Sequence, residues 1–363
     1  MNKKLLAIAV ASALVAPLAA NANDNVIYGQ MHYSWDFIDT NNVTGDASDD
    51  QTGVSRASRL GFKGSEDLGD GMKAVYQIEG QIDSSFDARN TFVGLAGGFG
   101  TLVMGRHDTP YKISTGSLDI FGDTIADYNM VIGRYMTNTT TGATDTRFDE
   151  RVPQTVAYIT PDFGGFHAAI ARISAKQNEL PGAAESEAWS LAGIYKNGPL
   201  FASLAYERVD DGNGAFAGAP IRIGAGGGTA ATDESDAWKL GLGYSFGDGK
   251  IGFVYEEIDG EAANTDKKGY LVNYAHNFGN NTFKIAYGVN DDIGNVANSG
   301  SDMLALGLDH SFSKRTSVYA IYATMDNDSG AAYGLNGGNG LGAAGGVQGR
   351  DVDALSFGIV HKF

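Results

Sequence analysis

Large apolar residues alternate with small or polar residues along most of the chain after residue 25. Between Trp238 and Phe246 every second residue is large and apolar, and the intervening residues are Lys, Gly, Gly and Ser. The segments 282–290 and 303–312 repeat this pattern. Successive side chains of a β-strand point to opposite faces of the sheet. Each segment therefore predicts a strand with one apolar face and one face of small or polar residues.

The composition of the second face separates two all-β architectures. A soluble β-sandwich turns a charged, mixed face to water and buries its apolar face against another sheet. Here the second face is rich in Gly, Ala, Ser and Asn, which is typical of a membrane barrel whose apolar face meets lipid while the other lines a lumen. Aromatic residues at the segment ends match the interfacial girdles of such barrels. We expect the strand glycines Gly241, Gly243 and Gly288 to keep the lumen open; the sandwich is the alternative.

Sixteen segments fit the strand pattern, the first at 25–38 and the last at 351–363. Short turns alternate with long loops, of which the longest lies at 108–150. No stretch after residue 22 approaches the roughly 20 consecutive apolar residues of a spanning helix. We therefore predict an all-β fold, a 16-stranded antiparallel transmembrane β-barrel, with fourteen or eighteen strands as alternatives. Its interior should be filled with water, because side chains fill only smaller barrels.

The first 22 residues have the pattern of a secretory signal peptide. Two lysines precede the apolar segment 5–20, and Ala20 and Ala22 provide the small residues of a cleavage site. Such segments are removed after export. We therefore expect two regions, a signal peptide at 1–22 and one β-barrel at 23–363. A buried N-terminal helix is the alternative for the first region.

Composition excludes several classes of site. The 363 residues include no cysteine, so a disulfide, a thiolate nucleophile and a cysteine-ligated metal are all excluded. The net charge of −17 argues against nucleic-acid binding, which needs a basic face. The six histidines lack metal-ligand spacing. The segment GLGAAG at 340–345 matches a dinucleotide motif, but no helix pattern follows it. We expect no cofactor, no metal site and no catalytic residue.

Four segments carry a resemblance to a known family. They are SRLGFKGSEDLGD at 58–70, FVGLAGGFGTLVMGRHDTPY at 92–111, QTVAYITPDFGGF at 154–166 and the alternating C-terminus that ends at Phe363. The chain resembles the general porins of Gram-negative bacteria, and among them the trimeric porins common in Neisseria and related proteobacteria. His361 departs from the family's pattern, in which Tyr is more usual at that position.

The resemblance implies a location, partners and a function. A porin of this family lies in the bacterial outer membrane as a homotrimer, in contact with outer-membrane lipid and lipopolysaccharide. Its terminal aromatic residue, here Phe363, resembles the signal that the outer-membrane assembly machinery reads. The implied function is a water-filled channel for the passive diffusion of ions and small hydrophilic solutes, and not an enzyme.

The resemblance also implies a role for the loop at about 108–150. In such porins the third long loop folds into the barrel and narrows it at mid-height. The acidic residues of this loop are spaced four apart, so on a short helical turn they would share one face; they are Asp119, Asp123 and Asp127. The basic residues implied for the opposite wall are Arg59, Lys63, Arg89, Arg106, Arg147 and Arg151. Alternation favours Arg59, Lys63 and Arg106, because it places them off the apolar face, where a charge costs about 2–4 kcal/mol at mid-membrane.

An acidic loop opposite a basic wall would create a transverse electric field across a narrow aperture. Such a field selects solutes by charge, while the width of the aperture selects them by size. A channel with a binding site for one substrate, and an outer-membrane enzyme or adhesin, are the alternative functions. The sequence leaves the ion preference open, because the basic wall favours anions and the three aspartates favour cations.

Overall fold

The computed structural model describes residues 25–40, 50–83, 86–138, 143–146, 148–176, 185–210, 234–260, 266–335 and 348–363. The predicted signal peptide, the glycine motif at 340–345 and Arg147 lie outside these residues. Among the described helices, none has the length and apolar character that would let it cross a membrane.

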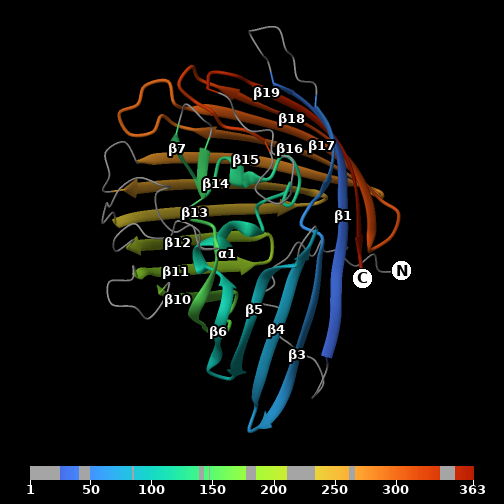
Figure 1. The fold of residues 1–363 in the computed structure, drawn as a ribbon. Coiled ribbons are helices and arrows are strands. Elements are labelled where there is room, and N and C mark those ends of the chain that lie inside the picture. The colour runs from blue at the N-terminus through green and yellow to red at the C-terminus, as the bar shows by residue number, and fades with distance from the viewer. Residues whose placement is uncertain are drawn as a thin grey trace.

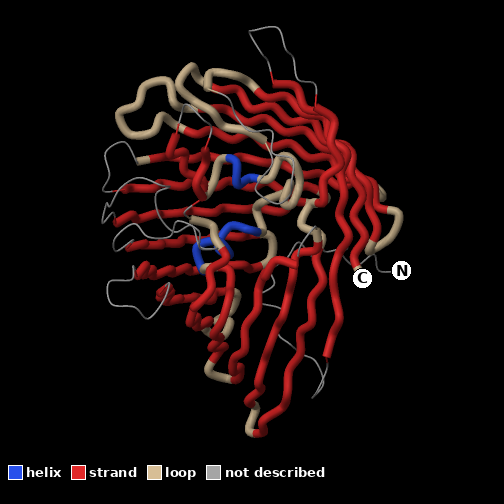
Figure 2. Tube along the Cα trace, in the orientation of Figure 1, coloured by secondary structure: helices blue, strands red, loops and turns tan. Residues whose placement is uncertain are grey.

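Strands make up most of the described chain (Figures 1 and 2). The strands of the barrel wall are β1 (Asn25–Thr40), β2 (Asp50–Ser55), β3 (Arg59–Gly69), β4 (Met72–Ile82), β5 (Phe86–Gly97), β6 (Gly100–Asp108), β9 (Arg151–Ile159), β10 (Phe166–Lys176), β11 (Glu185–Asn197), β12 (Leu200–Asp210), β13 (Glu234–Phe246), β14 (Gly249–Gly260), β15 (Lys267–Phe278), β16 (Asn281–Asn290), β17 (Ser301–Ser311), β18 (Thr316–Asn327) and β19 (Val352–Lys362). Between β6 and β9 lie the helix α1 (Pro110–Gly116), the 3₁₀ turn η1 (Tyr128–Met130) and the small hairpin β7–β8 (Arg134–Asn138 and Ala143–Thr146).

The wall strands form one closed antiparallel sheet. Each strand pairs with its neighbours in the chain, and β1 pairs with β19, so that the first and last strands lie side by side (Figure 1). β2 and β3 both pair with β1, one after the other along its length. They count as one barrel strand that is interrupted at 56–58, which gives sixteen strands. The predicted 16-stranded barrel is confirmed, and closure satisfies the backbone groups that an open edge would expose to lipid.

The two faces of the wall differ as the sequence predicts. On β13 the side chains of Trp238, Leu242 and Tyr244 are exposed on the outside, whereas Lys239 and Gly241 are buried on the inside. The same alternation runs along β16 and β17. The apolar face therefore looks outward along these strands, which excludes the soluble sandwich.

Tight turns join the strands at one end of the barrel. β3 and β4 are connected by two residues only, Asp70 and Gly71, whose φ angles are +51° and +76°. Two-residue hairpins of this kind require positive φ at both positions, and the Asp-Gly pair is among the few that adopt it readily. The turn residues thus fix the register of the wall from which the inner side chains project.

Candidate pore constriction

The segment 109–150, which we call the inner loop, leaves β6 and turns into the barrel. Thr109 caps α1, because its side-chain oxygen accepts a hydrogen bond from the backbone N–H of Lys112 at 3.2 Å, and Pro110 occupies the first helical turn. α1 then packs against β10–β13. Beyond α1, apolar side chains of the inner loop form a buried cluster with residues of the wall, including Leu118, Phe121, Val131, Leu271 and Met303.

Glycines on the inner face of the wall lie directly beneath the inner loop. A Cβ atom added at Gly241 would lie 2.8 Å from Cγ2 of Thr115, and one at Gly243 would lie 2.9 Å from Cδ2 of Leu118. At Gly288 the nearest atom would be Cγ2 of Val131, at 2.7 Å. The expectation that these glycines keep the lumen open is therefore wrong. They make room for the inner loop to pack against the wall.

Polar side chains of the wall also hold the backbone of the inner loop. Buried carbonyl groups need hydrogen-bond partners, and no local sequence pattern indicates which residues supply them here. Three donors do so: Lys250 Nζ to Ser117 O at 2.5 Å, Asn273 Nδ2 to Leu118 O at 2.7 Å, and Lys267 Nζ to Val131 O at 2.5 Å. The inner loop is thus fixed to β14 and β15 at two positions near its start and at one near its middle.

Asp149 anchors the far end of the inner loop. Its carboxylate forms an ion pair with Lys239 of β13, and both side chains are completely buried. The same carboxylate accepts hydrogen bonds from the hydroxyl of Tyr128 at 2.7 Å and from Asn129 Nδ2 at 3.0 Å. Burial and the nearby Asp149 carboxylate raise the pKa of Tyr128 well above its ordinary value, so the phenol keeps its proton and stays a donor.

Glu256 of β14 provides a second anchor. One carboxylate oxygen accepts the hydroxyl of Tyr111 at 2.8 Å, and the other accepts the backbone N–H of Gly133 at 2.6 Å. The ammonium group of Lys239 lies 4.1 Å from the centre of the Tyr111 ring. Both ends of the inner loop therefore meet one inward-facing group of charged side chains, which the sequence analysis missed.

The three aspartates of the inner loop lie in turns and not on one face of a helix, so the helical arrangement considered for them is wrong. Asp119 Oδ1 accepts the N–H of Phe121 at 3.0 Å. Asp127 accepts the N–H groups of Asn129 and Asp123, both at 2.9 Å. Short polar side chains commonly bond nearby backbone in this way, and this competes with helix formation.

The environments of these aspartates differ strongly. Burial, reinforced by the neighbouring Asp127, raises the pKa of Asp119 well above its usual range. Burial also raises the pKa of Asp127, to about 6. Burial acts on Asp123 too, but the guanidinium groups of Arg59 and Arg89 outweigh it, so the pKa of Asp123 is lowered. Asp123 is therefore the aspartate that is fully ionised at neutral pH.

Asp123 reaches across to the basic wall. Its Oδ2 lies 3.3 Å from Nη1 of Arg59 on β3, and the two side chains are 25% and 19% exposed. Arg89 on β5 pairs with Glu79 at 2.6 Å, and Nζ of Lys63 lies 5.0 Å from the centre of the Tyr28 ring. These groups occupy β1, β3, β4 and β5, on the opposite side of the barrel from the anchors of the inner loop.

The remaining basic residues lie where β6 meets β9. Arg151 pairs with Asp108 at 3.0 Å, and its Nε donates to Asn90 Oδ1 at 2.9 Å. Arg106 donates to the backbone carbonyl of Arg151 at 2.7 Å and pairs in register with Thr91. The structure thus brings Arg106 to the Arg151 backbone and not to an aspartate of the inner loop.

Comparison with known proteins agrees with this architecture. The family model described as Gram-negative porin matches residues 7–331. The chain is 30% identical to outer membrane porin protein 32 of Delftia acidovorans over 385 aligned residues, with all of both chains covered. The chain belongs to the Gram-negative porin family. It therefore lies in the bacterial outer membrane, as the sequence predicts.

Further relatives of the porin support the same fold. Major outer membrane protein P.IA of Neisseria meningitidis is 27% identical, with all of both chains covered. The solved anion-selective porin from Comamonas acidovorans is 26% identical, with a TM-score of 0.77 over 94% of this chain and all of that one. OmpT of Vibrio cholerae in its trimer form shares the fold, with a TM-score of 0.66, 18% identity, and coverage of 94% and 100%.

One basic residue of the porin wall was missed by sequence reasoning. Arg56 lies between β2 and β3 and is completely buried. It forms an ion pair with Asp36 of β1, and its Nε donates to Ser34 Oγ at 3.0 Å. Ser356 of β19 donates to the same aspartate at 2.6 Å. The signal in the sequence is the spacing of the two arginines in Ser55–Arg59 (SRASR), which brackets the break in the strand.

Proposed function

We propose that this porin is a diffusion channel whose narrowest point lies between Asp123 of the inner loop and the basic groups of β3 and β5. The contact between Asp123 and Arg59 carries the proposal, because it is where the inner loop, anchored on β13–β15, meets the opposite wall. Ions and small hydrophilic solutes would pass beside this contact, and no catalytic step is involved.

The charges at this place form two opposed groups. Asp123 faces Arg59 and Arg89, and Lys63 lies on the same wall. A low-dielectric wall strengthens the field between such groups, and the field orients dipolar solutes and separates the paths of anions and cations. Arg151 extends the basic group towards β9, whereas Arg106 supports the backbone of Arg151.

The balance of charge favours anions. The basic wall carries Arg59, Lys63, Arg89 and Arg151, and three of these pair with the carboxylates of Asp123, Glu79 and Asp108. Burial raises the pKa of Asp119 well above its usual range and that of Asp127 to about 6, so the negative charge of the inner loop is lowest below that pH. The relative from Comamonas acidovorans is described as anion-selective. Anion preference is therefore part of the proposal.

The oligomeric state and the membrane partners are proposed from the relatives. A homotrimer in contact with outer-membrane lipid and lipopolysaccharide is proposed, since one solved relative is described as a trimer form. The role of Phe363 as the signal for the assembly machinery is proposed with it. Phe363 exchanges two backbone hydrogen bonds with Gly29 of β1, both at 3.1 Å, and its side chain is 44% exposed at the end of the last strand.

Planar-bilayer conductance with the purified porin tests the channel. We expect ohmic steps in groups of three, and larger steps for Asp123→Ala and Arg59→Ala because each removes one side of the aperture. Block of the current by one solute at low concentration would instead indicate a substrate-selective channel. Absence of conductance from correctly folded protein would overturn the proposal and favour an enzyme or adhesin.

A further inference from the structure

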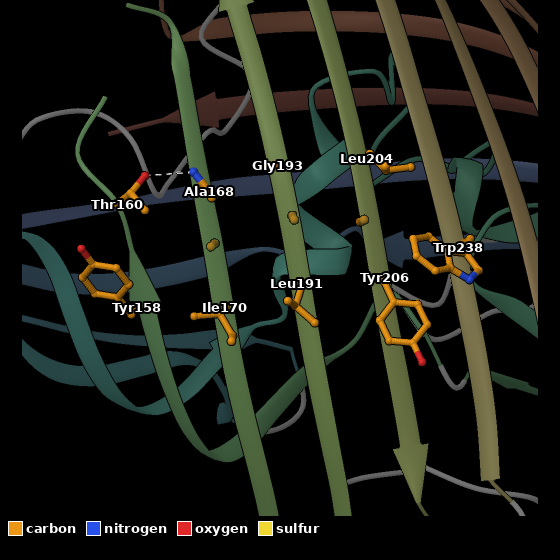
Figure 3. Close-up of a pocket in the computed structure, with 12 residues that line it drawn as sticks. Tyr158, Thr160, Ala168, Ile170, Leu191, Gly193, Leu204, Tyr206 and Trp238 are labelled. Atoms are coloured by element: carbon orange, nitrogen blue, oxygen red, sulfur yellow. Dashed lines mark hydrogen bonds between the residues drawn. The ribbon is translucent and has the colours of Figure 1, made fainter. Parts of the chain in front are cut away.

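A shallow groove crosses the outward faces of β9–β13, on the membrane side of the wall against which α1 packs from inside (Figure 3). Its volume is about 510 Å³, and almost all of its lining is apolar. Ala168 and Gly193 are partners in the sheet and form its floor, between the longer side chains of Ile170, Leu191 and Leu204. The small residues on this outward face therefore leave a depression in an otherwise filled surface.

Aromatic side chains flank this groove. Tyr206 and Trp238, whose ring centroids are 4.6 Å apart, lie at the end of the groove nearer the long connections, and Tyr158 of β9 lies in the same row of strand partners. Tyr and Trp rings prefer the boundary between the hydrocarbon and the head groups. The groove therefore runs from the apolar band of the wall towards the head-group layer.

Two arginines lie beyond that end of the groove. Arg172, Trp189 and Arg208 are consecutive partners across β10, β11 and β12. Cζ of Arg172 lies 5.1 Å from the centre of the Trp189 ring. Arg172 pairs with Glu187 and Arg208 with Glu234, yet the side chains of the two arginines remain 30% and 50% exposed. A guanidinium group has five N–H donors, more than one carboxylate uses, and its geometry suits phosphate.

These arginines belong to the outer leaflet. They lie near the ends of the strands that the long connections 177–184 and 211–233 join, whereas β11 and β12 meet at the other end through the tight turn at Gly198. In outer-membrane barrels the long loops are extracellular and the short turns periplasmic. A lipid whose head group reaches Arg172 and Arg208 thus has its chain beside the groove.

We propose that the groove holds one acyl chain of a phosphate-bearing lipid of the outer leaflet, with the phosphate bound by Arg172 and Arg208. Apolar packing alone gives an acyl chain little preference for the groove over the surrounding bilayer, since the neighbouring lipid chains are as apolar as the wall. Selectivity must come from the guanidinium groups, and the concave floor fixes the position of the chain. Glu187, Glu234 and Asp236, which accepts the hydroxyl of Tyr206, place three carboxylates beside the two guanidinium groups. Binding of a phosphate therefore depends on direct hydrogen bonds from the exposed parts of Arg172 and Arg208 and not on the net charge of this region, and a preference for anionic lipid tests it.

The tryptophans of the chain provide the readout. There are three, Trp35, Trp189 and Trp238. The double substitution Trp35→Phe/Trp189→Phe leaves Trp238 in the groove, and Trp189→Phe/Trp238→Phe leaves Trp35, which is exposed on β1 away from it. Each variant is placed in phosphatidylcholine vesicles with a small fraction of chain-brominated phosphatidylglycerol or chain-brominated phosphatidylcholine. Bromine quenches tryptophan fluorescence on contact.

We expect the quenching of Trp238 by brominated phosphatidylglycerol to saturate at a fraction at which brominated phosphatidylcholine quenches several-fold less. Trp35 should be quenched equally by both lipids. Arg172→Gln/Arg208→Gln should abolish the difference at Trp238. Equal quenching of Trp238 by the two lipids would overturn the proposal. Protection of Trp238 from both lipids would overturn it as well, because another protein surface, such as a second copy, would then cover the groove.

A groove-filling variant separates a fixed chain from general lipid contact. A Cβ atom at Gly193 would meet the Phe166 ring no closer than 3.4 Å, an ordinary contact, so Gly193→Leu adds volume to the groove without strain at the backbone. We expect it to remove the saturable part of the quenching. Ala168→Leu fills the same floor and replaces it if Gly193→Leu fails to show the circular dichroism of the folded barrel. Saturable quenching that persists in a folded variant would contradict the proposal.

Discussion

Lys239 of β13 and Asp149 of the inner loop form an ion pair in which both side chains are completely buried. Removing one partner leaves an unpaired buried charge, which costs on the order of 3–5 kcal/mol. We expect Lys239→Met to lower the thermal stability of the barrel and to increase the noise of single-channel currents, because the inner loop loses an anchor. Lys239→Met/Asp149→Leu should recover part of both losses. Equal stability of the single and double variants would contradict this role.

The glycines beneath the inner loop lead to a second prediction. Gly288→Val places a side chain where Cγ2 of Val131 already lies, and overpacking of this kind costs about 1–3 kcal/mol. The inner loop should be displaced, which lowers the melting temperature and changes the single-channel conductance. Gly98→Ala is the matched control, because an added Cβ there has nothing within 4 Å. If the two variants had the same conductance, Gly288 would not support the inner loop.

The pKa values of the inner loop predict a pH-dependent selectivity. Burial raises the pKa of Asp127 to about 6, so this carboxyl is neutral below that pH and charged above it. The preference for anions should therefore weaken as the pH rises through about 6. Glu150, whose pKa burial raises to about 7, contributes in the same direction over a slightly higher range. Asp127→Asn/Glu150→Gln should flatten this profile in measurements of reversal potential.

The free energy of unfolding should also depend on pH through these raised pKa values. A carboxyl group whose pKa is higher in the folded protein binds protons more tightly when folded, so the folded state loses stability as the pH rises from the ordinary pKa of the group to the raised one. For Asp127 this window lies between about 4 and about 6. Asp248→Asn, in an exposed turn, is the control that should leave the pH profiles of stability and selectivity unchanged.

The wall was predictable from the sequence because alternation is local. Each strand carries its own pattern, and the closed sheet follows once sixteen such segments are joined by turns such as Asp70–Gly71. The position of the inner loop depends on contacts between residues that are far apart in the sequence. Lys239 and Asp149 are 90 residues apart, and nothing near either residue indicates the other. Gly241 and Gly243 of β13 were correctly placed on the inner face, but only the fold shows that Thr115 and Leu118 pack against them.

The charged residues likewise divide into those that the local strand pattern indicates and those that only the fold brings together. Arg59 stands out in the strand pattern, and in the structure its guanidinium group lies 3.3 Å from Asp123 of the inner loop. Arg56 was missed because the strand is interrupted there and the alternation is lost. The spacing of the aspartates indicated one face of a helix, and this was wrong, because Asp119 and Asp127 accept hydrogen bonds from backbone N–H groups in turns.

The reversal potential of the porin in a salt gradient tests the central claim most directly. Arg59→Gln should lower the ratio of anion to cation permeability, and Asp123→Asn should raise it, because the two side chains carry opposite charges at the aperture. Arg315→Gln, in an exposed turn, should leave the ratio unchanged. If both aperture variants kept the reversal potential of the unsubstituted porin, the aperture would not lie between Arg59 and Asp123.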